Sequence, residues 1–203
     1  MAEPALEEWV RPASNDDSRA AVAPDGHGNR AADFGVRDDP ADLFRMLLRE
    51  VEAAAALLEK DWGVAADVWS APSFTELRRE GLAADRWNML HPEGKQRISF
   101  VEKSLKERPA GPVVAASDYL KAFADQIRPF VPKDRVYRVL GTDGFGRSDS
   151  RAKLRHFFEV NRIFVTIAAL KALADQGEGK AKAVADALKK YGIDPDKADP
   201  TTV

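Results

Sequence analysis

Residues 137–158, YRVLGTDGFGRSDSRAKLRHFF, contain the pattern that decides the fold of this chain. A short run of β-forming residues at 136–140 leads into a glycine-rich loop, and a helix can then begin at Ser148 or Ser150. Strand, loop and helix in this order form the repeating unit of an open α/β sheet. We therefore expect a strand at 136–140 whose carboxyl end meets the loop.

The same alternation extends toward both ends of the chain. Two further strands are expected at 64–69, VAADVW, and at 113–116, VVAA. Apolar residues that recur every three or four positions predict the helices, which we place at 41–62, from Ser73, at 97–107, at 117–130, from Ser148 or Ser150 to Phe158, from Ile163 to Gly177, and at a last segment ending at Tyr191. Crossovers of this length favour parallel pairing. The predicted fold class is α/β, with an open, mostly parallel sheet and helices on both faces.

The N-terminal part has a different composition. Residues 1–39 are rich in Pro, Gly, Asp, Asn and Arg, and their apolar residues, such as Trp9 and Phe34, show no helical or strand period. This composition predicts disorder. At Pro40 a helical pattern begins. We therefore divide the chain into a disordered or unrelated tail at 1–39 and one domain at 40–203.

The charges of the chain nearly balance. The 31 lysines and arginines face 33 aspartates and glutamates, and the net charge is −2. No strong field would attract nucleic acid or anionic lipid, so neither partner is expected. The absence of cysteine excludes disulfides and thiolate zinc sites, and the N-terminus lacks a signal-peptide pattern. We expect a soluble, cytoplasmic protein.

Several strings are specific enough to indicate a family. They are LREVEAAAALLEKDWGVAADVWS at 48–70, SFTELRREG at 73–81, RWNMLHP at 86–92, GPVVAASDYLKAFADQIRPF at 111–130, and YRVLGTDGFGRSDSRAKLRHFF at 137–158. Together they resemble the C-terminal, transketolase C-terminal-like domain of the homodimeric-type bacterial pyruvate dehydrogenase E1 component. The resemblance covers roughly residues 47–203.

The resemblance implies a function for the intact enzyme. That enzyme decarboxylates pyruvate on thiamine diphosphate with Mg²⁺ and transfers the acetyl group to a lipoyl group of the dihydrolipoyl acetyltransferase E2. The family binds its cofactor between two domains that this chain lacks. We therefore expect no catalytic, cofactor-binding or metal-binding residue here, a structural role that supports the E1 dimer, and no activity from the chain alone.

The chain departs from the family pattern at three places. Family members have a strand before the helix at 41–62, whereas residues 29–39 contain no credible buried strand. We therefore expect the first strand to be missing, which would leave an unpaired sheet edge. Asn161 and Ile163 stand where an aspartate and a histidine are expected, so any polar contact made there is in doubt.

The loop after the third strand is the candidate site. Its glycines suit a tight turn, and its spacing matches neither a dinucleotide fingerprint nor a P-loop. We therefore interpret it as an interdomain or subunit-interface loop, with the candidate residues Asp143, Gly144, Phe145, Gly146, Arg147, Ser148 and His156. Ligand binding at its carboxyl-end position is the less favoured alternative.

Two other functions stay open. The chain could be a free-standing, non-catalytic module that binds E1 or E2, or a truncated remnant.

The three histidines, His27, His91 and His156, are far apart in the sequence and do not form a zinc-ligand pattern.

Overall fold

A computed structural model describes residues 11–12, 30–35 and 45–203 of the chain. In this part the sheet has five strands in the order β1-β3-β2-β4-β5. The strands are β1 (Arg11–Pro12), β2 (Arg30–Gly35), β3 (Ala65–Ser70), β4 (Val113–Ala116) and β5 (Tyr137–Leu140). Strands β2 to β5 pair in parallel, and β1 pairs antiparallel with β3. The predicted α/β class with a mostly parallel sheet is confirmed.

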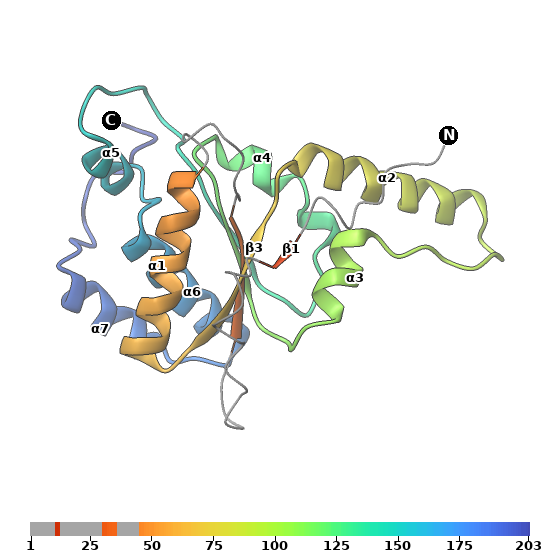
Figure 1. The fold of residues 1–203 in the computed structure, drawn as a ribbon, viewed down its shortest axis with the longest axis horizontal. Coiled ribbons are helices and arrows are strands. Elements are labelled where there is room, and N and C mark those ends of the chain that lie inside the picture. Colours follow the sequence, from red (N-terminus) through yellow and green to blue (C-terminus); the bar gives the residue numbers. More distant parts are fainter. Residues whose placement is uncertain (1–10, 13–29, 36–44) are drawn as a thin grey trace.

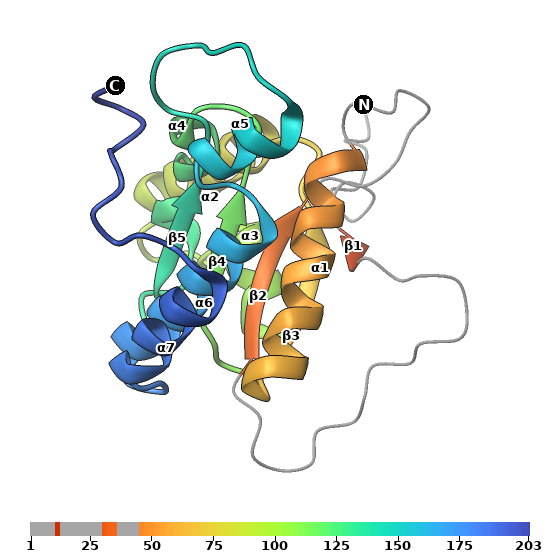
Figure 2. The same ribbon diagram turned by 90° about the vertical axis from the view of Figure 1, so that its left-hand side faces the viewer.

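Helices lie on both faces of the sheet (Figure 1). One face carries α1 (Arg45–Trp62), α6 (Arg162–Gln176) and α7 (Ala181–Tyr191). The other carries α2 (Phe74–Leu90), α3 (Phe100–Lys106), α4 (Lys121–Asp125) and a short 3-10 helix, Arg128–Phe130. The remaining helix, α5 (Arg151–Phe157), lies with α4 at one end of the sheet (Figure 2). None of the described helices is long and apolar enough to cross a membrane.

The interior strand β4, which lies between β2 and β5, divides the core between the two faces. Val113 and Ala115 pack into the cluster under α2, α3 and α4, whereas Val114 and Ala116 pack against α1 and α6. All four are fully buried. Alternate side chains of a strand point to opposite faces, so a strand covered on both faces is apolar throughout. This explains why VVAA was recognisable as a strand.

The expectation that the first strand is missing was wrong. Residues 30–35 form β2, which lies in the middle of the sheet with Ala32 opposite Asp67 on one side and Val113 on the other. Its composition gives a weak strand signal because Ala, Asp and Gly are depleted in strands. Pairing on both sides provides partners for its backbone groups, and this tertiary context overrides the local preference.

The predicted boundary at residues 39 and 40 lies outside the described residues, as does most of the predicted disorder at 1–39. The two described stretches of that tail are the strands β1 and β2. The predicted helix at 117–130 is broken into α4 and the 3-10 helix. Its expected cap, Ser117, instead accepts a hydrogen bond from the backbone N–H of Tyr119 in a loop (3.0 Å).

Candidate functional site

The carboxyl ends of β4 and β5 meet at one end of the sheet (Figure 2). The two loops that follow them are joined by three hydrogen bonds. The Thr142 N–H donates to the Tyr119 carbonyl oxygen (2.9 Å), and the Thr142 hydroxyl donates to the Asp118 carbonyl oxygen (2.9 Å). The Asp143 carboxylate accepts from the Lys121 N–H (3.0 Å). These bonds fix the start of the predicted interface loop.

Two glycines of this loop allow close packing. A Cβ atom at Gly141 would lie 2.6 Å from the Lys121 nitrogen and 2.7 Å from the Tyr119 oxygen. At Gly144, where φ is +123°, a side chain would collide with the Pro200 carbonyl oxygen. Glycine is required at both positions because neither leaves room for a Cβ. The loop is therefore packed against the C-terminal segment, a contact that the sequence did not indicate.

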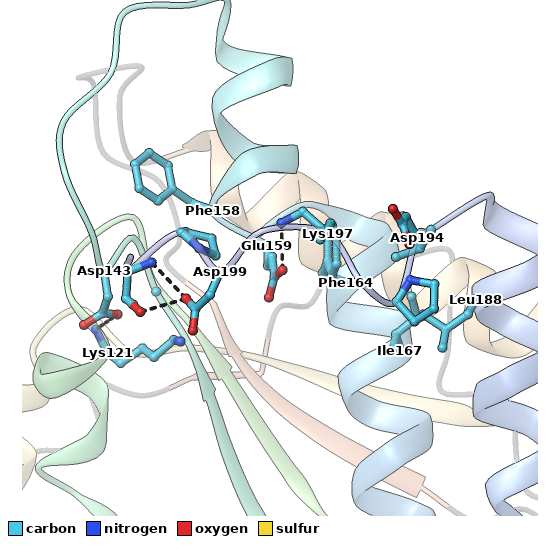
Figure 3. A pocket seen from close by; sticks show the side chains of 15 residues that line it. Lys121, Asp143, Phe158, Glu159, Phe164, Ile167, Leu188, Asp194, Lys197 and Asp199 are labelled. Atoms are coloured by element: carbon cyan, nitrogen blue, oxygen red, sulfur yellow. Dashed lines mark hydrogen bonds and ion pairs between the residues drawn. The ribbon is translucent and has the colours of Figure 1, made fainter. Parts of the chain in front are cut away.

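A pocket of about 470 Å³ lies beside this contact (Figure 3). Its inner wall is apolar and includes Phe164 and Ile167 of α6. At its rim, the Lys197 ammonium binds the Glu159 carboxylate (2.8 Å) and donates to the Phe157 carbonyl oxygen (3.1 Å). The backbone of Glu159 has a positive φ of 61°, which is uncommon for a residue other than glycine. The ion pair thus joins the C-terminal segment to the turn after α5.

Asp199 fixes the last turn of the chain over the same pocket (Figure 3). Its carboxylate accepts hydrogen bonds from the Thr201 N–H (2.8 Å) and the Thr201 hydroxyl (2.7 Å). These two bonds hold the pKa of Asp199 below its ordinary value. Asp199, Glu159 and Lys197 at the rim are therefore engaged in holding the C-terminal segment.

The remaining candidate residues of the loop point in different directions. Phe145 is 72% exposed, and Ser148 is also exposed. A Cβ at Gly146 would meet nothing within 4 Å. The guanidinium carbon of Arg147 lies 4.1 Å from the centre of the Phe157 ring. The loop thus presents one large apolar side chain to solvent, while its arginine is held against α5.

His156 lies against the start of α6. Its ring centre is 5.5 Å from that of Phe164, and its Nδ1 atom is 3.5 Å from the Asn161 side-chain nitrogen. Asn161 caps α6, because its side-chain oxygen accepts from the N–H groups of Ile163 (3.1 Å) and Phe164 (3.2 Å). The polar contact that was in doubt at Asn161 is therefore a helix cap.

A network of charged side chains near this end was not foreseen. Arg162 binds the Glu50 carboxylate with two side-chain nitrogens, at 2.9 Å each. Arg155 lies 3.8 Å from Glu50 and 3.4 Å from the Asp118 carboxylate. The hydrogen bonds from Arg162 hold the pKa of Glu50 below its ordinary value. More than a hundred residues separate Glu50 from its partners, so no local sequence signal could have revealed the network.

Within residues 11–12, 30–35 and 45–203, no group of three or more histidine, cysteine, aspartate or glutamate side chains could hold a metal ion. His91 stacks on Trp87, with ring centres 3.7 Å apart. The third histidine, His27, lies outside the described residues.

Residues 46–161 match the family model described as the transketolase-like TK C-terminal domain. The chain belongs to this family. The matched region contains the strands β3, β4 and β5 and the loop at their carboxyl ends. The matched region includes every candidate residue of the interface loop and also His156.

The curated relatives are pyruvate dehydrogenase E1 components. The chain is 61% identical over 154 residues to that of Pseudomonas aeruginosa, 62% over 174 residues to that of Cupriavidus necator, and 53% over 154 residues to that of Escherichia coli K12. These matches cover 76%, 83% and 76% of this chain, but 17%, 19% and 17% of the relatives. The chain thus spans less than a fifth of their length. The predicted resemblance is confirmed.

Solved structures also match. A transketolase from Pichia stipitis aligns with 86% of this chain and 19% of its own, at a TM-score of 0.47 and 15% identity. A split-gene transketolase, described as an inactive β4 tetramer, aligns with 73% of this chain and 40% of its own, at a TM-score of 0.43 and 16% identity.

Proposed function

We propose that this chain is the C-terminal portion of a pyruvate dehydrogenase E1 component and has a structural role in that enzyme. The observation that carries the proposal is the identity of 61% and 62% to E1 components, confined to less than a fifth of their length. The intact enzyme would decarboxylate pyruvate and transfer the acetyl group to a lipoyl group on E2. This chain alone would be inactive.

In this proposal, other domains of E1 bind thiamine diphosphate and Mg²⁺. The expected partners are a second E1 chain and the dihydrolipoyl acetyltransferase. The cytoplasmic location stays a prediction.

The carboxyl-end surface is our candidate for contact with the rest of E1. We define it by the exposed side chains Tyr119, Leu120, Phe123 and Phe145. Phe145 is 72% exposed and Tyr119 is 58% exposed, and the Tyr119 and Phe123 rings lie 5.6 Å apart. Aromatic residues that are exposed on an isolated chain are enriched at protein interfaces. The predicted interface loop therefore contributes Phe145 to this surface.

Pyruvate turnover tests the proposal. The purified chain is assayed with thiamine diphosphate and Mg²⁺, with and without an E1 variant that lacks its C-terminal domain. We expect no turnover from the chain alone and restored turnover on mixing. Turnover by the chain alone would contradict the proposal. Association without turnover would favour the non-catalytic module, and the absence of both would favour a remnant.

Substitution of Phe145 tests the surface itself. We expect Phe145→Ser to weaken association with the truncated E1 by about tenfold or more, because aromatic residues at interfaces often contribute 2 kcal/mol or more. Met89→Ser is the matched control, since Met89 is 71% exposed and lies in the last turn of α2. Equal effects of the two substitutions on the Kd would count against the assigned surface.

A further inference from the structure

A second pocket, of about 390 Å³, lies between the interface loop and α5. We call it the arginine pocket. Its lining residues are Asp118, Thr142, Gly144, Gly146, Arg147, Arg151, Leu154, Arg155, Phe158 and Val160. Three arginines therefore face one aspartate among the lining residues, whose summed charge is positive, and Glu50 lies 3.8 Å from Arg155 just outside the lining. This contrasts with the chain as a whole, whose net charge is −2.

The pocket lies where the sheet topology favours ligands. From the central strand β2 the chain passes first to β3 on one side, and later to β4 on the other. Ligands of open α/β sheets bind outside the carboxyl ends of the strands at such a reversal. Asp118 follows the carboxyl end of β4, and Val160 packs in the same cluster as Ala116, the last residue of β4. The pocket is thus next to the reversal point.

The protein's own contacts hold two of the arginines in place. The Arg155 side chain is 11% exposed and lies near Asp118 (3.4 Å) and Glu50 (3.8 Å). Arg147 lies over the Phe157 ring at 4.1 Å. Arg151 is one helical turn before Arg155 on α5. Guanidinium groups that are already positioned lose less side-chain freedom when they bind an anion.

The opposite wall leaves room for a ligand near the backbone at Gly146. This residue carries no side chain, and a Cβ there would meet nothing within 4 Å. A ligand can therefore approach the main chain closely at this position. The volume falls within the usual range for small-molecule sites, roughly 300–1,000 Å³.

We propose that the arginine pocket binds a small phosphate-bearing molecule. Planar guanidinium groups donate paired hydrogen bonds to phosphate oxygens, and such charge-assisted bonds are stronger than neutral ones. The concave shape fits a small anion better than the acidic face of a protein. Phe145 does not line this pocket. Anion binding therefore depends on Arg151 and Arg155 and docking on E1 depends on Phe145, while Arg147 belongs to both the pocket and the predicted interface loop.

Calorimetric titration of the whole purified chain with inorganic pyrophosphate tests the proposal. We expect saturable binding with a Kd below about 1 mM, and weaker binding of inorganic phosphate because it offers fewer oxygens. Arg151→Gln should raise the Kd by about tenfold or more. Arg79→Gln is the matched control, because Arg79 is an exposed arginine on α2. Its Kd should equal that of the wild type.

Three results would overturn the proposal. The first is a heat of binding that does not saturate or does not exceed that of sodium chloride at equal ionic strength. The second is an equal effect of Arg151→Gln and Arg79→Gln on the Kd for pyrophosphate. The third is tighter binding of hexaglutamate than of pyrophosphate. The last result would assign the arginines to an acidic protein segment. The titration uses the chain alone, so its outcome does not depend on whether the chain restores turnover to truncated E1.

Discussion

Arg135 is a buried arginine whose side chain donates hydrogen bonds to backbone carbonyl oxygens. Its side chain is 8% exposed and donates to the carbonyl oxygens of Leu105 (2.7 Å), Arg108 (2.9 Å) and Gly111 (3.3 Å). Leu105 lies in the last turn of α3, and its oxygen also accepts from the Arg108 N–H (3.1 Å), whereas Arg108 and Gly111 lie between α3 and β4. Arg135 therefore connects the end of α3 to the segment before β4.

Replacing Arg135 should destabilise the fold strongly. We expect Arg135→Met to lower the free energy of unfolding by about 2–4 kcal/mol, because the substitution removes the arginine donor from the carbonyl oxygens of Arg108 and Gly111. Urea unfolding monitored by circular dichroism measures the change. Arg79→Met, at an exposed position of α2, should change stability by less than about 0.5 kcal/mol. A similar loss in both variants would refute the assigned role.

Glu50 makes part of the stability dependent on pH. Its pKa lies below the ordinary value of 4.5, chiefly because Arg162 donates side-chain hydrogen bonds to the carboxylate. A carboxylate with a lowered pKa in the folded state contributes stability above the unfolded pKa, and the contribution is lost as pH falls through the folded pKa. We expect Glu50→Gln to cost about 1 kcal/mol at neutral pH.

The difference between wild type and Glu50→Gln should shrink as the pH falls below 4.5 and the wild-type carboxylate becomes protonated. Unfolding free energies measured at a series of pH values check this behaviour. Glu52→Gln, an exposed position on the same helix, is the control. A wild-type advantage that is constant across the whole range would show that the ion pair does not contribute in this way.

The sequence predicted single residues well where the signal was local. Ser73, where the start of a helix was predicted, caps α2 by accepting from the Glu76 N–H, and Gly177 and Gly192 end their helices with positive φ. Arg155 and Lys197 were not foreseen as paired residues. Their partners come from other elements, and the distances become short only after the sheet has formed.

Asn161 allows a test at the scale of one helix. Because its side-chain oxygen caps α6, we expect Asn161→Ala to lower the free energy of unfolding by about 1 kcal/mol. Asn161→Asp should retain the wild-type stability, since aspartate caps helices equally well. Urea unfolding of both variants gives the answer. If both substitutions cost the same, the cap is not the source of the effect.

Among the elements, the strands β3, β4 and β5 and the helices after β3 and β5 could be predicted because their residue patterns are strong, whereas the helix predicted at 117–130 is broken into α4 and the 3-10 helix. β2 could not, since none of its residues is a β-branched side chain and its stability as a strand comes from neighbours on both sides. The candidate loop was placed correctly at the carboxyl ends, but its packing against Pro200 required the fold.

β2 also decides how much of the chain is needed for a stable molecule. We expect a variant that starts at residue 45, and therefore lacks β2, to aggregate, because β3 and β4 would expose unpaired backbone groups toward each other. A variant that starts at residue 30 keeps β2 and should stay folded. Light scattering and circular dichroism compare them. A folded, monodisperse chain starting at residue 45 would contradict this account.

The position of β2 has a consequence for the order of folding during synthesis. Arg30 pairs with Ala65, whereas Ala32 also pairs with the much later Val113, so the first pairing closes the shorter stretch of chain. The unit β2-α1-β3 can therefore assemble while the rest is still being translated. The edge of β2 that pairs with β4 stays unpaired until β4 has been synthesised. Slow codons between residues 70 and 113 would lengthen this period, during which the nascent chain can misassemble.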